Sequence, residues 1–208
     1  MRATVLCALL ALCGCRSGAP EAPELGGEGA AINMVRALRL AGDCNAAAPV
    51  LARLQKETPV DLEVMLETAK CELAGGRFAR AAEVLGAAVK IHPSSSEAET
   101  VLGVTLDHLE RSAEARVHHD RAVALAPGSA MALSNKSISL ALAGDLDEAL
   151  ALMRKAAALR DAPRRVRLNL ALLEAVAGNG EVARALAQQE ADPETIGLLQ
   201  RIAEAAKR

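Results

Sequence analysis

Apolar residues from residue 28 onward follow a helical spacing. Near the C-terminus, Ile196, Leu199 and Ile202 fall on one face of a helix, while the charged residues around them fall on the other. Alanine and leucine fill most apolar positions and favour helices, whereas the residues typical of strands are scarce. The pattern predicts an all-α chain that ends in a helix over residues 193–207.

Three residue types recur with the same period of 34 residues. Proline does so at three positions, alanine at five and glycine at four, and Glu110 takes the glycine position in one unit. An internal period of this length indicates a stack of similar units, each a pair of helices. The recurring residues are Pro59, Pro93 and Pro127; Ala47, Ala81, Ala115, Ala149 and Ala183; and Gly42, Gly76, Gly144 and Gly178.

The period and its residue types resemble the tetratricopeptide repeat (TPR). The third unit matches best, with Gly103, Ala115 and Pro127 at repeat positions 8, 20 and 32. The resemblance implies an all-α, right-handed TPR solenoid of about five helix-turn-helix repeats over residues 28–197. The helix over 193–207 overlaps the last unit and caps the stack. The units are 28–61, 62–95, 96–129, 130–163 and 164–197.

Each recurring residue type has a physical role in such a unit. Small residues let two helices approach closely, glycine suits the left-handed turn that ends the first helix, and proline stops the second. In the fourth unit, Ser137 takes the small position 8 and Asp161 replaces the proline. Glu190 takes the small position 27 of the fifth unit, so we expect this unit to pack less well and to grade into the cap.

Composition and charge exclude several classes of function. Of the 208 residues, 51% are hydrophobic and 24% are charged, which allows a buried core and rules out wholesale disorder. The net charge of −2 offers no basic surface for nucleic acid. The chain has no Trp or Tyr and a single Phe, Phe78, so it also lacks a platform on which bases could stack. We therefore expect no nucleic-acid binding.

The first fifteen residues are typical of a bacterial lipoprotein signal. Arg2 precedes about ten apolar residues, a run too short to span a membrane. The run ends in Leu12-Cys13-Gly14-Cys15, which resembles a lipobox. The resemblance implies removal of a signal peptide over residues 1–14 and lipidation of Cys15; an ordinary cleaved signal is the alternative.

The residues after Cys15 predict where the chain is anchored and how it is held. Arg16, not Asp, follows the lipidated cysteine, so we expect attachment to the outer membrane, facing the periplasm. Proline and glycine are frequent in residues 15–27, which favours a flexible tether between the lipid and the repeats.

We find no motif of a catalytic, metal or cofactor site. His118-His119-Asp120 lies within the third unit, where adjacent helical residues point about 100° apart and do not converge on one metal. His119 falls on a packing position of the repeat and the triplet is interpreted as ordinary helix surface. The sequence thus predicts a protein that is not an enzyme, with no cofactor and no small-molecule substrate.

Two cysteines remain in the repeats, Cys44 in the first unit and Cys71 in the second. In a TPR stack their helices lie antiparallel, so the two positions are plausible neighbours, and the periplasm is oxidising. A disulfide and two separate buried thiols are both compatible with the sequence.

The inner, concave face of a TPR stack is built by the first helix of each unit, and we expect it to bind a partner. Asn33, Asn135 and Asn169 share position 6, where consensus TPRs also favour asparagine and where an amide can hold the backbone of an extended peptide. Asparagine that is merely tolerated at an exposed helical site is the alternative. Other predicted binding residues of this face are Arg36, Ile138, Arg165 and Leu172.

Residues 133–177 resemble the TPR lipoprotein of the Tad (Flp) pilus assembly system. The matching residues include 140–144 (LALAG), Ala162-Pro163, and 165–172 (RVRLNLAL). The resemblance implies a non-catalytic scaffold or pilotin that binds the outer-membrane secretin. The alternatives are a type IV pilus pilotin, a lipoprotein of β-barrel assembly, or a periplasmic adaptor for peptidoglycan enzymes.

Overall fold

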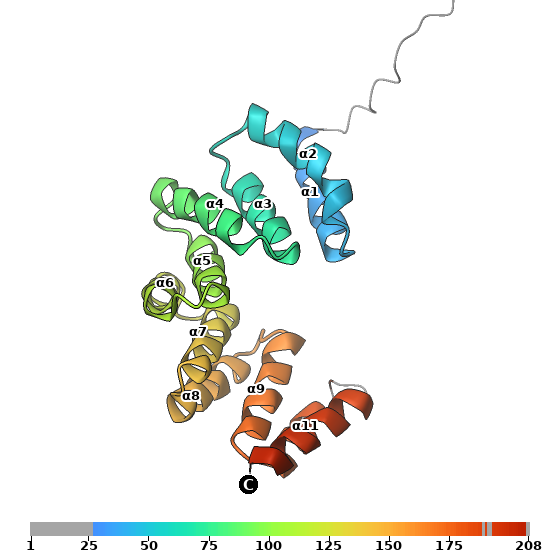
Figure 1. Cartoon of the computed structure of the whole chain (residues 1–208), viewed down its shortest axis with the longest axis vertical. Helices are drawn as coiled ribbons and strands as arrows, with labels where there is room; N and C mark the ends of the chain where they lie inside the picture. Colours follow the sequence, from blue (N-terminus) through green and yellow to red (C-terminus); the bar gives the residue numbers. More distant parts are fainter. Residues whose placement is uncertain (1–26, 189, 191–192, 207–208) are drawn as a thin grey trace, which may run out of the picture.

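The computed structural model describes residues 27–188, 190 and 193–206; the predicted signal peptide, Cys15 and the tether up to residue 26 lie outside these residues. The described residues form eleven α-helices and no strand, which confirms the all-α prediction (Figure 1). The helices are α1 (Gly27–Leu40), α2 (Cys44–Glu57), α3 (Leu62–Ala74), α4 (Phe78–Ile91), α5 (Ser96–His108), α6 (Ser112–Leu125), α7 (Ala130–Leu142), α8 (Leu146–Ala157), α9 (Arg164–Val176), α10 (Gly180–Ala187) and α11 (Pro193–Ala206).

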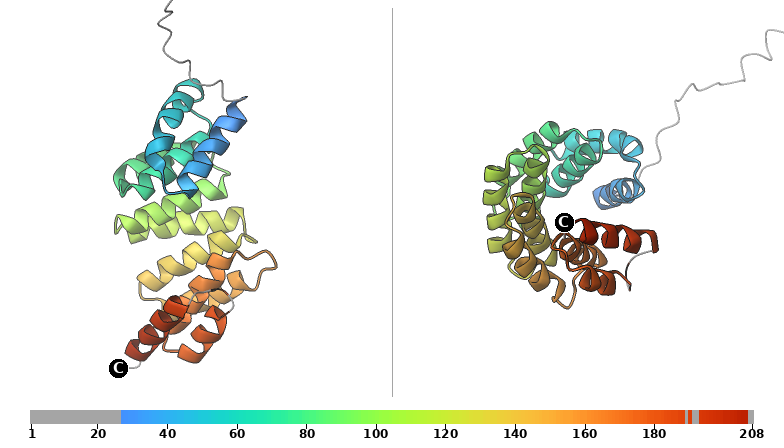
Figure 2. Two further views of the ribbon diagram at one scale, coloured as in Figure 1. Left: turned by 90° about the vertical axis from the view of Figure 1, so that its right-hand side faces the viewer. Right: turned by 60° about the horizontal axis from the view of Figure 1, so that its bottom comes forward.

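The helices stack in pairs into a solenoid that curves into an open ring when viewed along the stack (Figure 2). Each odd-numbered helix from α1 to α9 contacts the next odd-numbered helix. In the described part of the chain, α2, α4, α6 and α8 contact only their odd-numbered neighbours. The odd-numbered helices therefore form the inner face, and the even-numbered helices form the outer face.

Each turn between the two helices of a repeat has one residue in the left-handed conformation. After α7 this residue is Gly144, with φ +95°, and the following Asp145 N–H donates to the Leu140 carbonyl at 2.9 Å. In the third repeat Glu110 adopts the same conformation, with φ +59°. The turn is therefore kept even where a side chain makes it unfavourable.

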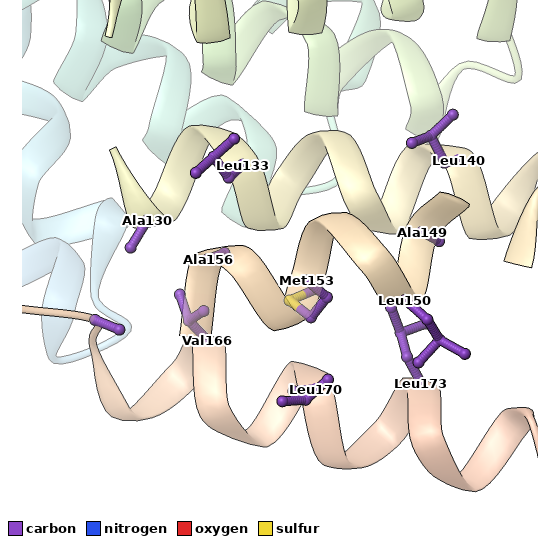
Figure 3. Packing of buried hydrophobic residues seen from close by; sticks show 11 residues of the cluster. Ala130, Leu133, Leu140, Ala149, Leu150, Met153, Ala156, Val166, Leu170 and Leu173 are labelled. Atoms are coloured by element: carbon purple, nitrogen blue, oxygen red, sulfur yellow. The ribbon is translucent and has the colours of Figure 1, made fainter. Parts of the chain in front are cut away.

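Small residues allow the close contact between the helices of a repeat. The five alanines at position 20 are all fully buried. The largest core cluster joins α7, α8 and α9, where Leu133 of α7 lies near Ala156 of α8 and Leu140 of α7 lies near Ala149 of α8 (Figure 3). Large side chains on one helix thus fill the space beside small ones on the next, as close packing requires.

Position 8 shows why the repeat needs a small residue. A Cβ built on Gly103 would lie 2.7–2.9 Å from ring atoms of His119, so glycine is required there. In the fourth repeat Ser137 takes this position, and its hydroxyl donates to the Ala149 carbonyl at 2.6 Å. This hydrogen bond satisfies a polar group that is fully buried.

The fifth repeat ends early because Glu190 cannot occupy a small, buried position. Helix α10 has eight residues, whereas the other even-numbered helices have 12 to 14. Glu190 instead accepts from Arg167 Nε at 2.6 Å and also contacts Arg164. Helix α11 covers α9 and α10, with Leu199 and Ala203 buried, and so caps the apolar end of the stack.

Cys44 and Cys71 form a disulfide that joins the first two repeats. Cys44 begins α2 and Cys71 lies in α3, and their Cα atoms are 5.4 Å apart. Of the two arrangements compatible with the sequence, the structure has the bridge.

Among the described residues between 27 and 206, no helix is both long enough and apolar enough to cross a bilayer.

Candidate binding groove on the inner face

A groove of about 740 Å³ runs along the inner face and is bounded by all five odd-numbered helices from α1 to α9. Its floor is apolar, with Val101 and Val104 of α5 and Met131 of α7. The polar side chains that line it include Arg39, Lys70, Glu97, Asn135 and Arg165. The space is large enough for several residues of an extended peptide or for a small molecule.

The N-terminal end of the groove is built around a buried carboxylate. Glu67 of α3 is only 1% exposed, and it accepts from Arg39 Nε of α1 at 2.6 Å and from Lys70 Nζ at 3.0 Å. Burial acts to raise the pKa of the Glu67 carboxyl, but the hydrogen bonds and charges of Arg39 and Lys70 outweigh it and lower the pKa. Glu67 is therefore held as a carboxylate.

Further ion pairs extend from Glu67 across three helices. Arg36 of α1 lies 3.8 Å from the Glu67 carboxylate and 3.6 Å from that of Glu63. Lys70 also contacts Glu97 of α5, with Nζ and Oε1 2.7 Å apart. We call Arg36, Arg39, Glu67, Lys70 and Glu97 the charge ladder. Its cations are already paired within the protein.

The C-terminal end of the groove differs because two of its polar groups are not paired. Among the described residues, neither Asn135 of α7 nor Arg165 of α9 has a hydrogen-bond or ion-pair partner, and both line the groove. An amide that can donate and accept, beside a free guanidinium, can bind the backbone and a carboxylate of a peptide.

Two of the seven predicted binding residues, Asn135 and Arg165, thus line the groove, and the other five do not. Asn169 donates to the buried Ser134 hydroxyl at 3.1 Å and so connects α9 to α7. Asn33 accepts from Arg36, which belongs to the charge ladder. Ile138 packs against the core between α7 and α9, and Leu172 is 37% exposed outside the groove.

Glu67 was not predicted from the sequence, although a signal for it existed. Glu67 occupies position 6 of the second repeat, where the first, fourth and fifth repeats have asparagine. A stacked pair beside the groove was not predicted either: the rings of Phe78 and His108 are parallel, with centroids 4.6 Å apart.

His118 and His119 were predicted to lie on ordinary helix surface, and this prediction is wrong. His118 Nδ1 lies 2.5 Å from the Glu99 carboxylate, and the fully buried His119 has its Nε2 2.9 Å from Asp107. The Ser139 hydroxyl donates to the same Asp107 at 3.0 Å. Because Ser139 bonds to the aspartate and not to a histidine, the set does not form a nucleophile with its base.

The described residues also offer no group of side chains arranged to bind a metal ion. No three His, Cys, Asp or Glu side chains within them converge as metal ligands would. What the inner face offers is hydrogen bonding, charge and apolar contact.

Comparison with known families agrees with the repeat geometry. The tetratricopeptide repeat family matches residues 32–96, 72–130 and 100–163, which together cover more than half of the chain. The chain belongs to the tetratricopeptide repeat family. No curated protein matches this TPR chain.

Solved TPR structures have the same fold. The thermophilic TPR protein TTC0263 of Thermus thermophilus is 25% identical, with a TM-score of 0.75 over 88% of this chain and 100% of its own. A tetratricopeptide repeat protein from Parabacteroides merdae is 16% identical, with a TM-score of 0.68 over 86% of this chain and 72% of its own. YrrB, a TPR protein with an unusual peptide-binding site, is 19% identical, with a TM-score of 0.55 over 86% of this chain and 90% of its own.

Proposed function

We propose that this TPR protein is a scaffold of the bacterial envelope that holds an extended segment of a partner protein in its inner groove. TPR proteins bind other proteins or peptides, and the similar structure of YrrB has a peptide-binding site. The role requires no chemical turnover. The observation that carries the proposal is the pair of unpaired groups, Asn135 and Arg165, beside an apolar floor.

The finer part of the proposal is a role in Tad (Flp) pilus assembly, with the outer-membrane secretin as the partner. Its support is the resemblance of residues 133–177 to the TPR lipoprotein of that system. The lipobox-like end of the signal supports anchoring through Cys15 at the periplasmic side of the outer membrane. A type IV pilus pilotin, a β-barrel assembly lipoprotein or an adaptor for peptidoglycan enzymes would use the same groove for another envelope partner.

The groove is tested with the double variant Asn135→Ala, Arg165→Ala. Each lost hydrogen bond contributes about 0.5–1.5 kcal/mol, and more where a charge is involved, so binding of the purified secretin should weaken by about tenfold or more. The melting temperature should stay nearly unchanged, because neither side chain has a partner among the described residues. Lys155→Ala, on the outer helix α8, is the exposed control.

The outcomes separate the general proposal from the finer one. Normal secretin binding and pilus formation in the double variant would exclude the inner groove from the mechanism. If the secretin does not bind the wild-type chain at all, the Tad assignment fails, and the groove is then tested with the partners of the other envelope systems.

The anchor is tested separately with Cys15→Ser. Loss of the lipid should release the chain into the soluble periplasmic fraction and abolish incorporation of labelled palmitate. A variant that stays with the outer membrane and keeps the label would contradict the proposed anchor.

A further inference from the structure

A second groove, of about 590 Å³, lies on the outer face between α4 and α6, and α5 forms its floor. The floor is apolar, with Val89 of α4 and Leu102 and Leu106 of α5. This outer groove shares no lining residue with the inner one. The proposed function does not use it.

The outer groove contains a polar pair, a buried glutamate and a half-buried histidine, where other repeats are apolar. Glu99 occupies position 4 and His118 position 23 of the third repeat, and both line the groove. Position 23 is aliphatic in the other four repeats, and position 4 is apolar in three of them. The corresponding residues are Val50, Val84, Leu152 and Leu186, and Ala31, Met65 and Leu133. A buried carboxyl group paired with a histidine, in place of well-packed apolar residues, is seldom justified by stability alone.

One oxygen of this pair is free to accept a hydrogen bond. Glu99 is only 4% exposed, and its Oε2 is held by His118 at 2.5 Å. Within the described chain, no hydrogen bond reaches Oε1, and the closest cation is Arg121, with Nη1 4.0 Å away. A ligand in the groove could therefore donate an N–H to Oε1.

Gly86 leaves open space above the floor. It lies in the interior of α4, where glycine is less favourable than any residue but proline. A Cβ built on Gly86 would meet no atom within 4 Å, so no packing inside the chain requires glycine there. In the other repeats this position has Ala52, Asp120, Arg154 and Gln188. Glycine at this position allows the backbone of another molecule to approach α4 closely.

Charge on the rim indicates which molecule fits. Lys90 stands on the α4 side with no partner among the described residues, and Arg121 stands on the α6 side. Arg111 also lines the groove, but Glu114 already pairs with it at 2.7 Å. Lys90 is therefore unpaired and Arg121 makes only the 4.0 Å contact with Glu99, so the positive charge on both rims complements carboxylates.

We propose that the outer groove is a second docking site, which takes an extended, acidic segment of a partner protein with an aliphatic residue at its centre. The aliphatic side chain enters over Leu102 and Val89, and the backbone crosses Gly86. A backbone N–H of the segment donates to Glu99 Oε1, and flanking carboxylates contact Lys90 and Arg121.

The test uses two synthetic peptides and the full chain labelled with ¹⁵N for NMR. Acetyl-Glu-Asp-Leu-Asp-Glu-amide should shift amide signals of residues 82–92 and 114–121, and acetyl-Lys-Lys-Leu-Lys-Lys-amide should not. Gly86→Leu should weaken binding of the acidic peptide by about tenfold or more, because its side chain fills the groove. Gly86→Ala, which adds one methyl group where the backbone of the segment crosses, should weaken binding less than Gly86→Leu does. Ala52→Leu, at the equivalent position of the first repeat, should bind like the wild type.

A second variant keeps the test decisive if Gly86→Leu does not fold. Lys90→Gln with Arg121→Gln should weaken the acidic peptide by about tenfold and remove most of the salt dependence of binding. Asn135→Ala with Arg165→Ala should leave this binding unchanged, which distinguishes it from the inner groove. The proposal is overturned if the acidic peptide does not bind, shifts only inner-groove signals, or binds equally to the filled or uncharged variants.

Discussion

The two ends of the inner face differ in what their polar side chains contact. In α1, α3 and α5, the charge ladder pairs each of its cations with Glu67, Glu63 or Glu97. In α7 and α9, Asn135 and Arg165 line the same groove without a partner among the described residues. Paired groups stabilise the stack, whereas unpaired groups remain available to a ligand.

The difference between the two ends of the inner face is clearest at repeat position 6. Position 6 carries Glu67 in the second repeat and Asn135 in the fourth. Glu67 is buried beneath cations of the neighbouring helix α1 and Lys70 of its own helix, and Asn135 stays partly exposed in the groove. One helical position can therefore serve stability or binding, depending on whether the neighbouring repeats supply countercharges.

The largest expected effect comes from removing the disulfide of the N-terminal repeats. In Cys44→Ala with Cys71→Ala, the free energy of unfolding should fall by about 3–4 kcal/mol, because the bridge restricts the unfolded chain over a separation of 27 residues. Hydrogen exchange should show faster opening in α1 to α3 and little change in α9 to α11, since repeat stacks open locally.

Thiol trapping supplies the control for this variant. The wild-type protein, purified without reductant and alkylated before and after reduction, should show Cys44 and Cys71 protected until reduction. Two alkylated cysteines in the unreduced sample would contradict the bridge.

Glu67→Gln is expected to have the next largest effect. It keeps the volume of the side chain but removes the charge that Arg39 and Lys70 surround, so the free energy of unfolding should fall by about 2–3 kcal/mol. Urea unfolding measures this loss. Glu83→Gln is the matched control, because Glu83 is exposed on the surface of α4 and pairs with Arg80 there. Equal stability of the two variants would show that the charge ladder does not stabilise the N-terminal repeats.

The same carboxylate predicts a dependence on pH. Because the pKa of Glu67 in the folded chain lies below its usual value of 4.5, its stabilisation is present above that pH. It is lost as the pH falls through the lower folded-state pKa. The Glu67→Gln variant should therefore show a flatter decline of stability in acid than the wild type.

Asn169 and Asn135 separate the two roles within the C-terminal repeats. Asn169→Ala should lower the free energy of unfolding by about 1 kcal/mol, because it leaves the buried Ser134 hydroxyl without this donor. Asn135→Ala should leave stability unchanged and weaken partner binding. Thermal unfolding and secretin binding of both single variants test the difference, and equal loss of stability in both would contradict it.

The sequence predicted the helices better than the binding groove, for a physical reason. The left-handed glycines and the buried alanines act within one repeat, so a period of 34 residues reveals them. The charge ladder and the bond from Asn169 to Ser134 connect different repeats, and they depend on the reach of long side chains. The carboxylate partners of His118 and His119 lie 19 and 12 residues earlier on a different helix, so the local pattern did not reveal them.

The smallest expected effect concerns the third repeat, between the two ends of the inner face. Glu110 has φ +59°, where the equivalent residues of the other four repeats are glycine. The Cβ disfavours this conformation by about 1–2 kcal/mol, and glycine relieves it but has more freedom to lose on folding. Glu110→Gly should therefore raise the free energy of unfolding by about 0.5–1 kcal/mol. Urea unfolding measures the gain, and Glu114→Gly, inside the neighbouring helix α6, should instead lose stability because glycine is unfavourable there. A loss of stability in Glu110→Gly would show that the Glu110 side chain contributes more to this turn than its conformation costs.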